Sequence, residues 1–355
     1  MKKIDISLLL SVILLTLFGL FMIFDASSFV AYRDFADKYH YVRDQFFWVI
    51  LGFIALAFFS YFDYHRFYSL AIPILAIALI LLILVFIPGI GVYLLGARRW
   101  IDTGIFIVQP AEFVKLALAI YLSAWFSNKE KGRLFAFLLL MVLVLGLVIL
   151  QPDMGTTAII LSEALVIYFL SGAKIVHLFL LVPIITFLGF LFIKFSSYRA
   201  KRLEAFLNIN ESIESSSYHV RQILIALGAG GITGVGLGNS IQKYAYLPES
   251  TTDSIFAIIA EEMGFIGATA LILFFIFIFG RAFYIAVNAK DNFGKLLGAG
   301  ITTFLAVQTI INLSAQTALV PLTGIPLPFL SYGGSSLIVD LAAVGILLNI
   351  SRRSG

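Results

Sequence analysis

Asp253 combines a residue type and a position that suit a general base. It ends the polar run 246–253, directly before a long apolar stretch that contains Glu261 and Glu262. An acid at the point where a membrane helix meets water can stay ionised yet partly desolvated, which suits proton abstraction from a substrate held at the membrane surface. The alternative is a capped helix entry, because Pro248 suits a first helical position and acids near a helix N-terminus are stabilised by the helix dipole.

Arg98 and Arg99, followed by Trp100, form a second candidate site. Two adjacent guanidinium groups outside an apolar helix can bind a diphosphate, because arginine presents planar, forked donors to phosphate oxygens. An arginine and tryptophan pair that anchors the chain at the membrane interface is the alternative. Lys115, inside the next apolar helix, could extend the anion site, although Glu112 lies three residues earlier and could simply pair with it.

Two further segments hold candidate binding residues. The turn 151–157 contains Asp153, which could bind a substrate or metal and could equally cap the following helix. The Pro/Gly-rich run 321–336 has a polar backbone that needs protein or water around it at membrane depth. A rigid loop without chemistry is the alternative to the cavity that we expect this run to line, with Ser331, Tyr332, Ser335 and Ser336.

Several kinds of chemistry are excluded or disfavoured. The sequence has no cysteine, which excludes thiolate nucleophiles and thiolate metal sites. The glycine-rich stretch 223–238 lacks the P-loop and dinucleotide-binding patterns, so we expect no nucleotide and no organic cofactor there. We expect instead a segment that is re-entrant or packed against other helices. The histidines lie apart, without metal-ligand spacing, and are interpreted as ordinary loop or interface residues: His40, His65, His177 and His219.

Composition places these candidates in a membrane protein. Hydrophobic residues make up 61% of the chain and charged residues only 12%, against about 25% charged residues in soluble domains. The net charge of +4 comes from scattered basic residues rather than a stripe, so nucleic acid is not an expected partner. A spanning helix needs about 20 mostly apolar residues. Such runs predict one all-α integral membrane domain, 1–355, with ten spanning helices at 6–24, 45–62, 67–90, 109–127, 134–150, 154–171, 175–194, 254–279, 296–319 and 334–351.

Ten spanning helices would put both termini on one side of the lipid bilayer, which the charge of the short loops identifies. Lysine and arginine gather on the terminal side, which we therefore expect to be cytoplasmic: Lys2, Lys3, Arg66, Lys129, Lys131, Arg133, Lys174, Arg281, Lys290, Lys295, Arg352 and Arg353. The segment 198–207 is basic and apolar and is expected to lie along the membrane interface. It belongs to the large loop between the seventh and eighth helices, one of the loops expected outside: 25–44, 91–108, 151–153 and 195–253.

Six motifs, taken together and in this order, resemble the SEDS family, which includes FtsW, RodA and SpoVE. The resemblance extends over essentially the whole chain. The motifs are Gly-Ala-Arg-Arg-Trp-Ile (96–101), Gln-Pro-Ala-Glu-Phe-Val-Lys (109–115), Gln-Pro-Asp-Met-Gly-Thr (151–156), Tyr-Leu-Pro-Glu (246–249) with Asp253, Ala-Glu-Glu-Met-Gly (260–264), and Gly-Ile-Pro-Leu-Pro-Phe-Leu-Ser-Tyr-Gly-Gly-Ser-Ser (324–336).

The resemblance implies a ten-helix peptidoglycan glycosyltransferase in the bacterial cytoplasmic membrane. Such enzymes polymerise lipid II on the outer face of the membrane and work with a class B penicillin-binding protein, a transpeptidase that crosslinks the product. Other membrane proteins of the divisome or elongasome are expected partners too. We expect an inverting transfer that releases undecaprenyl diphosphate. A divalent cation, Mg²⁺ or Mn²⁺, held by an acid such as Glu249, is a candidate cofactor.

The family pattern also suggests residue roles. Asp253 corresponds to the essential outward acid, and it would accept the proton of the acceptor sugar hydroxyl. Arg98 or Arg99, together with Lys115, corresponds to basic positions that would stabilise the charge developing on the leaving diphosphate. Trp100 corresponds to the aromatic residue beside them.

Some features separate relatives within the family. Residues 217–222 and 242–244 are more similar to FtsW than to RodA, so we prefer a division role to elongation. Many relatives carry Ala-His-Thr-Asp where this chain has Ser-Thr-Thr-Asp at 250–253, so a role for that histidine is in doubt here. Asp340 is a charge inside the last span where an uncharged residue is expected, and the family pattern does not explain it.

Two other function classes compete with the enzyme. A lipid II flippase would need a polar path to both membrane faces, and the deeper acids could line one: Glu163, Glu261, Glu262 and Asp340. A scaffold that only recruits a crosslinking enzyme would tolerate neutralisation of the outward acids. The clustering of informative polar residues on the expected outer side favours the enzyme.

Overall fold

A computed structural model describes residues 4–94, 97–104, 106–128, 132–194, 200, 203–204, 206–207 and 215–354. Each of the ten predicted spans coincides with a helix. The helices are α1 (Ile6–Phe35), α2 (His40–Tyr61), α3 (Arg66–Leu84), α4 (Pro110–Phe126), α5 (Leu134–Leu150), α6 (Met154–Leu170), α7 (Ile175–Lys194), α10 (Ile255–Val287), α11 (Asn292–Gln316) and α12 (Gly334–Ser354), with α9 (Ser215–Gly230) between α7 and α10. Six of them (α1, α2, α3, α10, α11 and α12) are long and apolar enough to cross a membrane, so this is a multi-pass membrane protein.

Two outer segments differ from the prediction. The expected loop 25–44 is mostly helical, because α1 continues to Phe35 and only residues 36–39 connect it to α2. Asp25, taken from the sequence as the end of the span, is paired with Lys243 and so does not end the helix. Between α3 and α4 the chain forms an antiparallel sheet in the order β1-β2-β3, whose strands are β1 (Gly91–Leu94), β2 (Ala97–Asp102) and β3 (Ile107–Val108).

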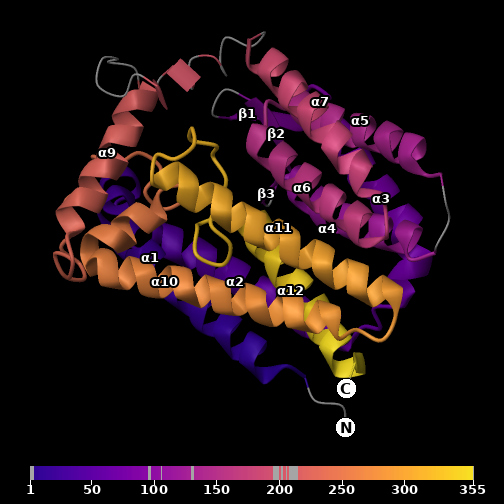
Figure 1. Cartoon of the computed structure of the whole chain (residues 1–355). Helices are drawn as coiled ribbons and strands as arrows, with labels where there is room; N and C mark the ends of the chain where they lie inside the picture. The colour runs from indigo at the N-terminus through magenta and orange to yellow at the C-terminus, as the bar shows by residue number, and fades with distance from the viewer. Residues whose placement is uncertain are drawn as a thin grey trace.

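The helices form two packed groups. α12 runs along α2 and contacts α1, α10 and α11, while α3, α4, α5 and α6 share a second apolar core. Both chain ends lie at the same end of the molecule, which we call the terminal end, and the strands lie toward the other, the sheet end (Figure 1). The described residues of the predicted basic side lie at or near the terminal end: Arg66, Arg133, Lys174, Arg281, Lys290, Lys295, Arg352 and Arg353. Outside the described residues lie Lys2, Lys3, Lys129, Lys131 and half of the predicted interfacial segment 198–207.

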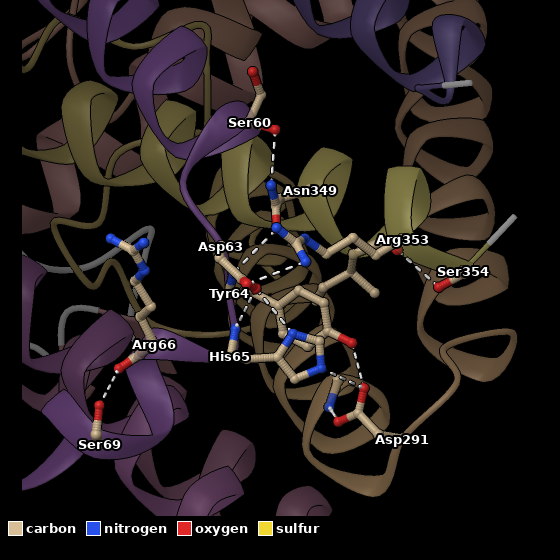
Figure 2. Close-up of polar contacts among 12 residues, drawn as sticks. Ser60, Asp63, Tyr64, His65, Arg66, Ser69, Asp291, Asn349, Arg353 and Ser354 are labelled. Atoms are coloured by element: carbon tan, nitrogen blue, oxygen red, sulfur yellow. Dashed lines mark hydrogen bonds and ion pairs between the residues drawn. The ribbon is translucent and has the colours of Figure 1, made fainter. Parts of the chain in front are cut away.

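A polar network joins the loops of the terminal end (Figure 2). The imidazole of His65 contacts Asp63 through Nδ1 at 2.9 Å and Asp291, at the start of α11, through Nε2 at 3.4 Å. Arg353 of α12 pairs with Asp63 at 3.1 Å. Side chains from three elements therefore satisfy one another's charges, and they tie the α2–α3 connection to α11 and α12.

Helix α10 is interrupted at Gly264, where the backbone has φ 66°. The interruption frees backbone groups on both sides. The carbonyl of Glu261 accepts a hydrogen bond from the amide of Val235 at 3.0 Å, and the amide of Phe265 donates to the carbonyl of Gly231 at 2.9 Å. The residues that follow make the same exchange: the amide of Gly236 donates to the carbonyl of Glu262, and the amide of Ile266 donates to the carbonyl of Ile232. The glycine-rich segment thus packs against α10, which was one of the two arrangements predicted for it.

Polar and ionic contacts hold the residues that directly follow the glycine-rich segment. The ammonium of Lys243 lies 2.9 Å from Asp25 of α1 and 2.9 Å from Glu262 of α10. The carboxylate of Glu261 accepts hydrogen bonds from the amide of Ile241 at 3.1 Å and from the hydroxyl of Ser240. Two acids that could have lined a transport path therefore anchor the connection that leads to Asp253.

Candidate functional site

A cavity of about 830 Å³ opens at the sheet end, a size typical of small-molecule sites. Its wall is built by α2, β2, β3, α9, the turn that precedes α10 and the segment that precedes α12. Seven of the residues predicted for the site or its cavity lie on this wall: Arg99, Trp100, Glu249, Asp253, Tyr332, Ser335 and Ser336. The cavity thus brings together an acid, a guanidinium and an aromatic ring that are far apart in the sequence.

Asp253 lies in a turn rather than inside a helix. Helix α10 begins at Ile255, so the expectation that Pro248 occupies a first helical position is wrong. The backbone of Glu249 is left-handed, with φ 49°, and its carbonyl accepts hydrogen bonds from the amides of Thr252 and Ser254 at 3.2 and 3.1 Å. Glu249 therefore closes the turn that presents Asp253.

Contacts to backbone carbonyls hold this turn. The hydroxyl of Ser331 donates to the carbonyl of Thr252 at 2.6 Å, and the amide of Tyr332 donates to the preceding carbonyl at 2.8 Å. The side-chain amide of Asn312, on α11, donates to the carbonyl of Asp253 at 3.2 Å. Because these bonds use backbone oxygens of the turn, they position the Asp253 carboxylate at the cavity without engaging it.

A glycine with left-handed backbone, Gly324, lies beside that carboxylate. Gly324 has φ 73°, a conformation that side chains rarely adopt. A Cβ atom added there would lie 3.4 Å from Oδ2 of Asp253. The segment before α12 therefore passes close to the acid, and both line the cavity.

A β-bulge decides which arginine reaches the cavity. Val92 of β1 pairs with Trp100 and Tyr93 pairs with Arg98, so Arg99 is the extra residue of β2. Consecutive side chains on a regular strand point to opposite faces, and a bulge changes that direction. Arg99 and Trp100 consequently both line the cavity, whereas Arg98 is exposed and does not.

The guanidinium of Arg99 is oriented by the turn before α6. Its Nε donates to the carbonyl of Gln151 at 2.9 Å and its Nη2 to the carbonyl of Pro152 at 2.5 Å. Arginine has five N–H donors, so this anchoring leaves donors for an anion in the cavity. Asp153, in the same turn, is buried and caps α6 by accepting from the amide of Thr156 at 3.0 Å. The structure thus gives Asp153 the capping role that was one of its two predicted interpretations.

Lys115 lies behind the cavity wall. It is completely buried, pairs with Glu112 at 2.7 Å and donates a hydrogen bond to Gln308. The amide group of Gln308 in turn donates to the carbonyl of Pro326 at 3.0 Å. Lys115 therefore supports the segment before α12 from below. Lys115 is not on the cavity wall, so its predicted contact with an anion has no counterpart there. Ser331, which was predicted to line the cavity, is not on the wall either and holds the Asp253 turn instead.

Three other polar residues lie at or below the cavity; the sequence assigned no site role to His219 or Asp44 and singled out Asp340 only as an unexplained charge and a deep acid. His219 of α9 lines the cavity, and its Nε2 lies 2.7 Å from the hydroxyl of Ser254. Asp44 of α2 is also on the wall. Deeper, Asp340 accepts a hydrogen bond from Ser336 at 3.4 Å. No local sequence signal marked His219 or Asp44, because a dispersed histidine and an acid within a predicted loop resemble ordinary surface residues.

The comparisons with known proteins agree with the arrangement of helices and cavity. Residues 5–355 match the family described as "Cell cycle protein" (FTSW_RODA_SPOVE). The chain belongs to the FtsW/RodA/SpoVE family. It is 41% identical to stage V sporulation protein E of Bacillus subtilis, covering 99% of this chain and 97% of that protein. It is 38% identical to a probable peptidoglycan glycosyltransferase FtsW of Trichlorobacter lovleyi, covering 98% and 93%.

Solved structures of this family share the fold. The chain superposes on the rod shape determining protein RodA of Thermus thermophilus with a TM-score of 0.73 and 27% identity, covering 99% of this chain and 97% of that one. A second match, with a TM-score of 0.82 and 25% identity, covers 100% and 99%. It comes from a structure described as "Structural coordination of polymerization and crosslinking by a peptidoglycan synthase complex".

Proposed function

We propose that this protein is a peptidoglycan glycosyltransferase that polymerises lipid II. The observation that carries the proposal is the shared cavity, whose wall includes Asp253, the anchored Arg99 and Trp100. A family relative named a probable peptidoglycan glycosyltransferase supports the same chemistry. The similarity to FtsW-named relatives favours a role in septal division over elongation.

The cavity residues divide the work of an inverting transfer. Asp253 accepts the proton of the acceptor sugar hydroxyl as that oxygen attacks the anomeric carbon of the lipid-linked donor. The bond from this carbon to the leaving undecaprenyl diphosphate breaks at the same centre, with inversion. The remaining donors of Arg99 stabilise the negative charge that collects on the diphosphate. Trp100 provides an apolar face beside that site for the sugar or lipid.

Polar groups from the segment before α12 complete the cavity. Burial and the neighbouring charge of Asp44 raise the pKa of Tyr332 to about 12, so its hydroxyl stays protonated at neutral pH and can donate to a substrate oxygen. Ser335 accepts a hydrogen bond from the backbone amide of Gln109 at 3.2 Å, which fixes its hydroxyl at the cavity wall. Arg98 and Lys115 would act only through longer-range charge, because neither lines the cavity.

A divalent cation fits the donor chemistry of the site. Glu249 and Asp253 supply carboxylate oxygens, which Mg²⁺ and Mn²⁺ prefer. Within the described part of the chain no cluster of three or more metal-binding side chains exists, so the substrate diphosphate would have to complete the coordination. When bound, the cation would neutralise charge on the leaving group.

The orientation follows from charge. Basic residues at the terminal end favour a cytoplasmic location for that end, so the cavity would open on the outer face of the bacterial cytoplasmic membrane. Lipid II would enter from the lipid bilayer there. A relative in a complex that coordinates polymerization and crosslinking supports a class B penicillin-binding protein as the crosslinking partner, among other divisome proteins.

The test is polymerisation of labelled lipid II by the purified protein, with and without its class B partner and divalent cations. Glycan chains are resolved on a gel for the wild type, for Asp253→Asn and for the exposed-loop control Asp37→Asn. Chains from the wild type and Asp37→Asn but not from Asp253→Asn support the proposal. Lipid II movement across vesicles without chain formation would support a flippase. Neither activity from folded protein would support a scaffold.

A further inference from the structure

His219 contacts the residue that follows the proposed base Asp253, although it is far from Asp253 in the sequence. It lies on α9, which packs beside α10 (Figure 1). Its Nε2 lies 2.7 Å from the hydroxyl of Ser254, which is completely buried and directly follows Asp253. The imidazole also reaches the cavity wall. His219 therefore contacts both the substrate space and the start of α10.

His219 differs chemically from the other groups that hold the turn. Ser331, Asn312 and the amide of Tyr332 donate to backbone carbonyls and do not change protonation near neutral pH. A neutral imidazole can accept the Ser254 hydroxyl proton on one ring nitrogen, whereas an imidazolium can only donate. Protonation of His219 would reverse this hydrogen bond. The histidine is thus, among the described tethers of the turn, the one with a titratable side chain.

Ser254 transmits such a change to the base. Its amide donates to the carbonyl of Glu249 at 3.1 Å, and its own carbonyl accepts from the amide of Ala257 at 3.0 Å. Ser254 thus joins the last bond of the turn to the first bond of α10. Its hydroxyl orientation is therefore coupled to the backbone that carries Asp253.

We propose that His219 is a positioning residue for Asp253, which it holds in a productive direction through the hydroxyl of Ser254. The proposal rests on the proposed glycosyl transfer. In the neutral state the imidazole accepts from Ser254 and fixes the start of α10. The other titratable groups on the cavity wall set the field around the ring, and a pH profile has to be interpreted with them: Asp44, Arg99, Glu249, Asp253 and Tyr332.

The fold does not depend on this imidazole. Helix α9 is docked by apolar side chains that are almost completely buried, namely Val220, Ile223 and Ala226. The backbone exchange at Gly264 holds the segment that follows α9. Truncation of His219 should therefore leave the melting temperature of the purified protein close to that of the wild type.

The test compares His219→Ala and His219→Gln with the wild type in the lipid II polymerisation assay. His177→Ala is the matched control, because His177 also bonds a hydroxyl, that of Tyr168 at 2.7 Å, but lies far from the cavity on α7. His219→Ala should lower kcat about tenfold with little change in KM, as expected for one lost positioning hydrogen bond. His219→Gln, which keeps a hydrogen-bond acceptor at this position, should restore most of the rate.

The outcomes separate the two proposals. If the wild type makes chains and His219→Ala makes them at the same rate, the positioning role is overturned while the glycosyltransferase stands. Equal losses in His219→Ala and His219→Gln, with a lowered melting temperature, would mean a structural role only and also overturn it. If the wild type with its partner makes no chains, both proposals fail.

Discussion

The two ends of the helix bundle are held together by different kinds of bonds. At the terminal end, His65, Asp63, Asp291 and Arg353 pair with one another, so their charges are spent on joining helices. At the sheet end, the side chains of Asn312 and Ser331 hold the Asp253 turn by donating to its backbone carbonyls. This second arrangement fixes the chain while it leaves acids and a guanidinium directed at a cavity. The contrast shows that the turn with the candidate base is held through its backbone oxygens rather than through side-chain ion pairs.

The most direct test of this difference removes one acid from each end. Asp253→Asn should lower the rate of glycan polymerisation by about 10²- to 10⁴-fold, the usual contribution of a general base, and leave the melting temperature unchanged. Asp291→Asn keeps an N-cap for α11 but loses the hydrogen bond from the buried Tyr64 hydroxyl and the contact with His65, so it should cost about 1–3 kcal/mol of stability and no activity. Gel-based rates and thermal melts measure both. Similar activity losses in the two variants would contradict the distinction.

The bulge in β2 predicts different roles for the two neighbouring arginines at the sheet end. Arg99→Lys removes the fork that both grips the α5–α6 turn and faces the cavity, so polymerisation should fall by about 10- to 100-fold. Arg98→Lys keeps a charge on an exposed side chain and should stay within about twofold of the wild type. Initial rates at saturating lipid II give the comparison. Equal losses at both positions would place the anion site outside the cavity.

The break in α10 predicts a loss of stability rather than of chemistry. Gly264→Ala puts a Cβ at φ 66° and 2.2 Å from the amide nitrogen of Gly234, and should cost roughly 1–3 kcal/mol. Gly280→Ala is the control in the same helix, because a Cβ there meets nothing within 4 Å and should stabilise by about 0.4–1 kcal/mol. Thermal unfolding in detergent distinguishes them. A Gly264→Ala protein as stable as the wild type would mean that the exchanged backbone bonds are dispensable.

The smallest expected effect concerns acid pH at the terminal end. Burial works against ionisation, but hydrogen bonds from His65 and the charge of Arg353 lower the pKa of Asp63 overall. A lowered pKa contributes stability that is complete above the ordinary value of about 3.9 and is lost as pH falls through the folded value. Arg353→Gln should reduce that acid-dependent loss by less than about 1 kcal/mol. Melting curves from pH 6 to pH 3 provide the measurement, and a larger loss in the variant would reverse the assigned sign.

Much of the fold was predictable because its signals are local. Apolar runs located each of the ten helices, and residue types beside those runs picked out Asp253 and Trp100. The end of α1 was not predictable, since Asp25 resembles a helix end until its partner Lys243, 218 residues away, is known. The sheet also escaped prediction, because its strands are only a few residues long and are defined by pairing.

The site residues show the same limit. The sequence could not choose between Arg98 and Arg99, because the choice depends on a bulge set by the partner strand. Lys115 carried a plausible charge and Glu112 was a visible local partner, but its burial against Gln308 arises from a helix distant in sequence. His219 looked ordinary because its partner Ser254 is 35 residues further along. Long-range packing thus decided which of the chemically suitable residues reach the cavity.

The interruption at Gly264 also constrains how the chain assembles. A bilayer offers no hydrogen-bond partner to the carbonyl of Glu261 or the amide of Phe265, and each unpaired group would cost several kcal/mol. These groups find their partners only in residues 231–236, which emerge from the ribosome before α10 does. We therefore expect the glycine-rich segment to be present at the membrane when α10 inserts. The two are expected to fold as one cooperative unit, so neither should become ordered without the other.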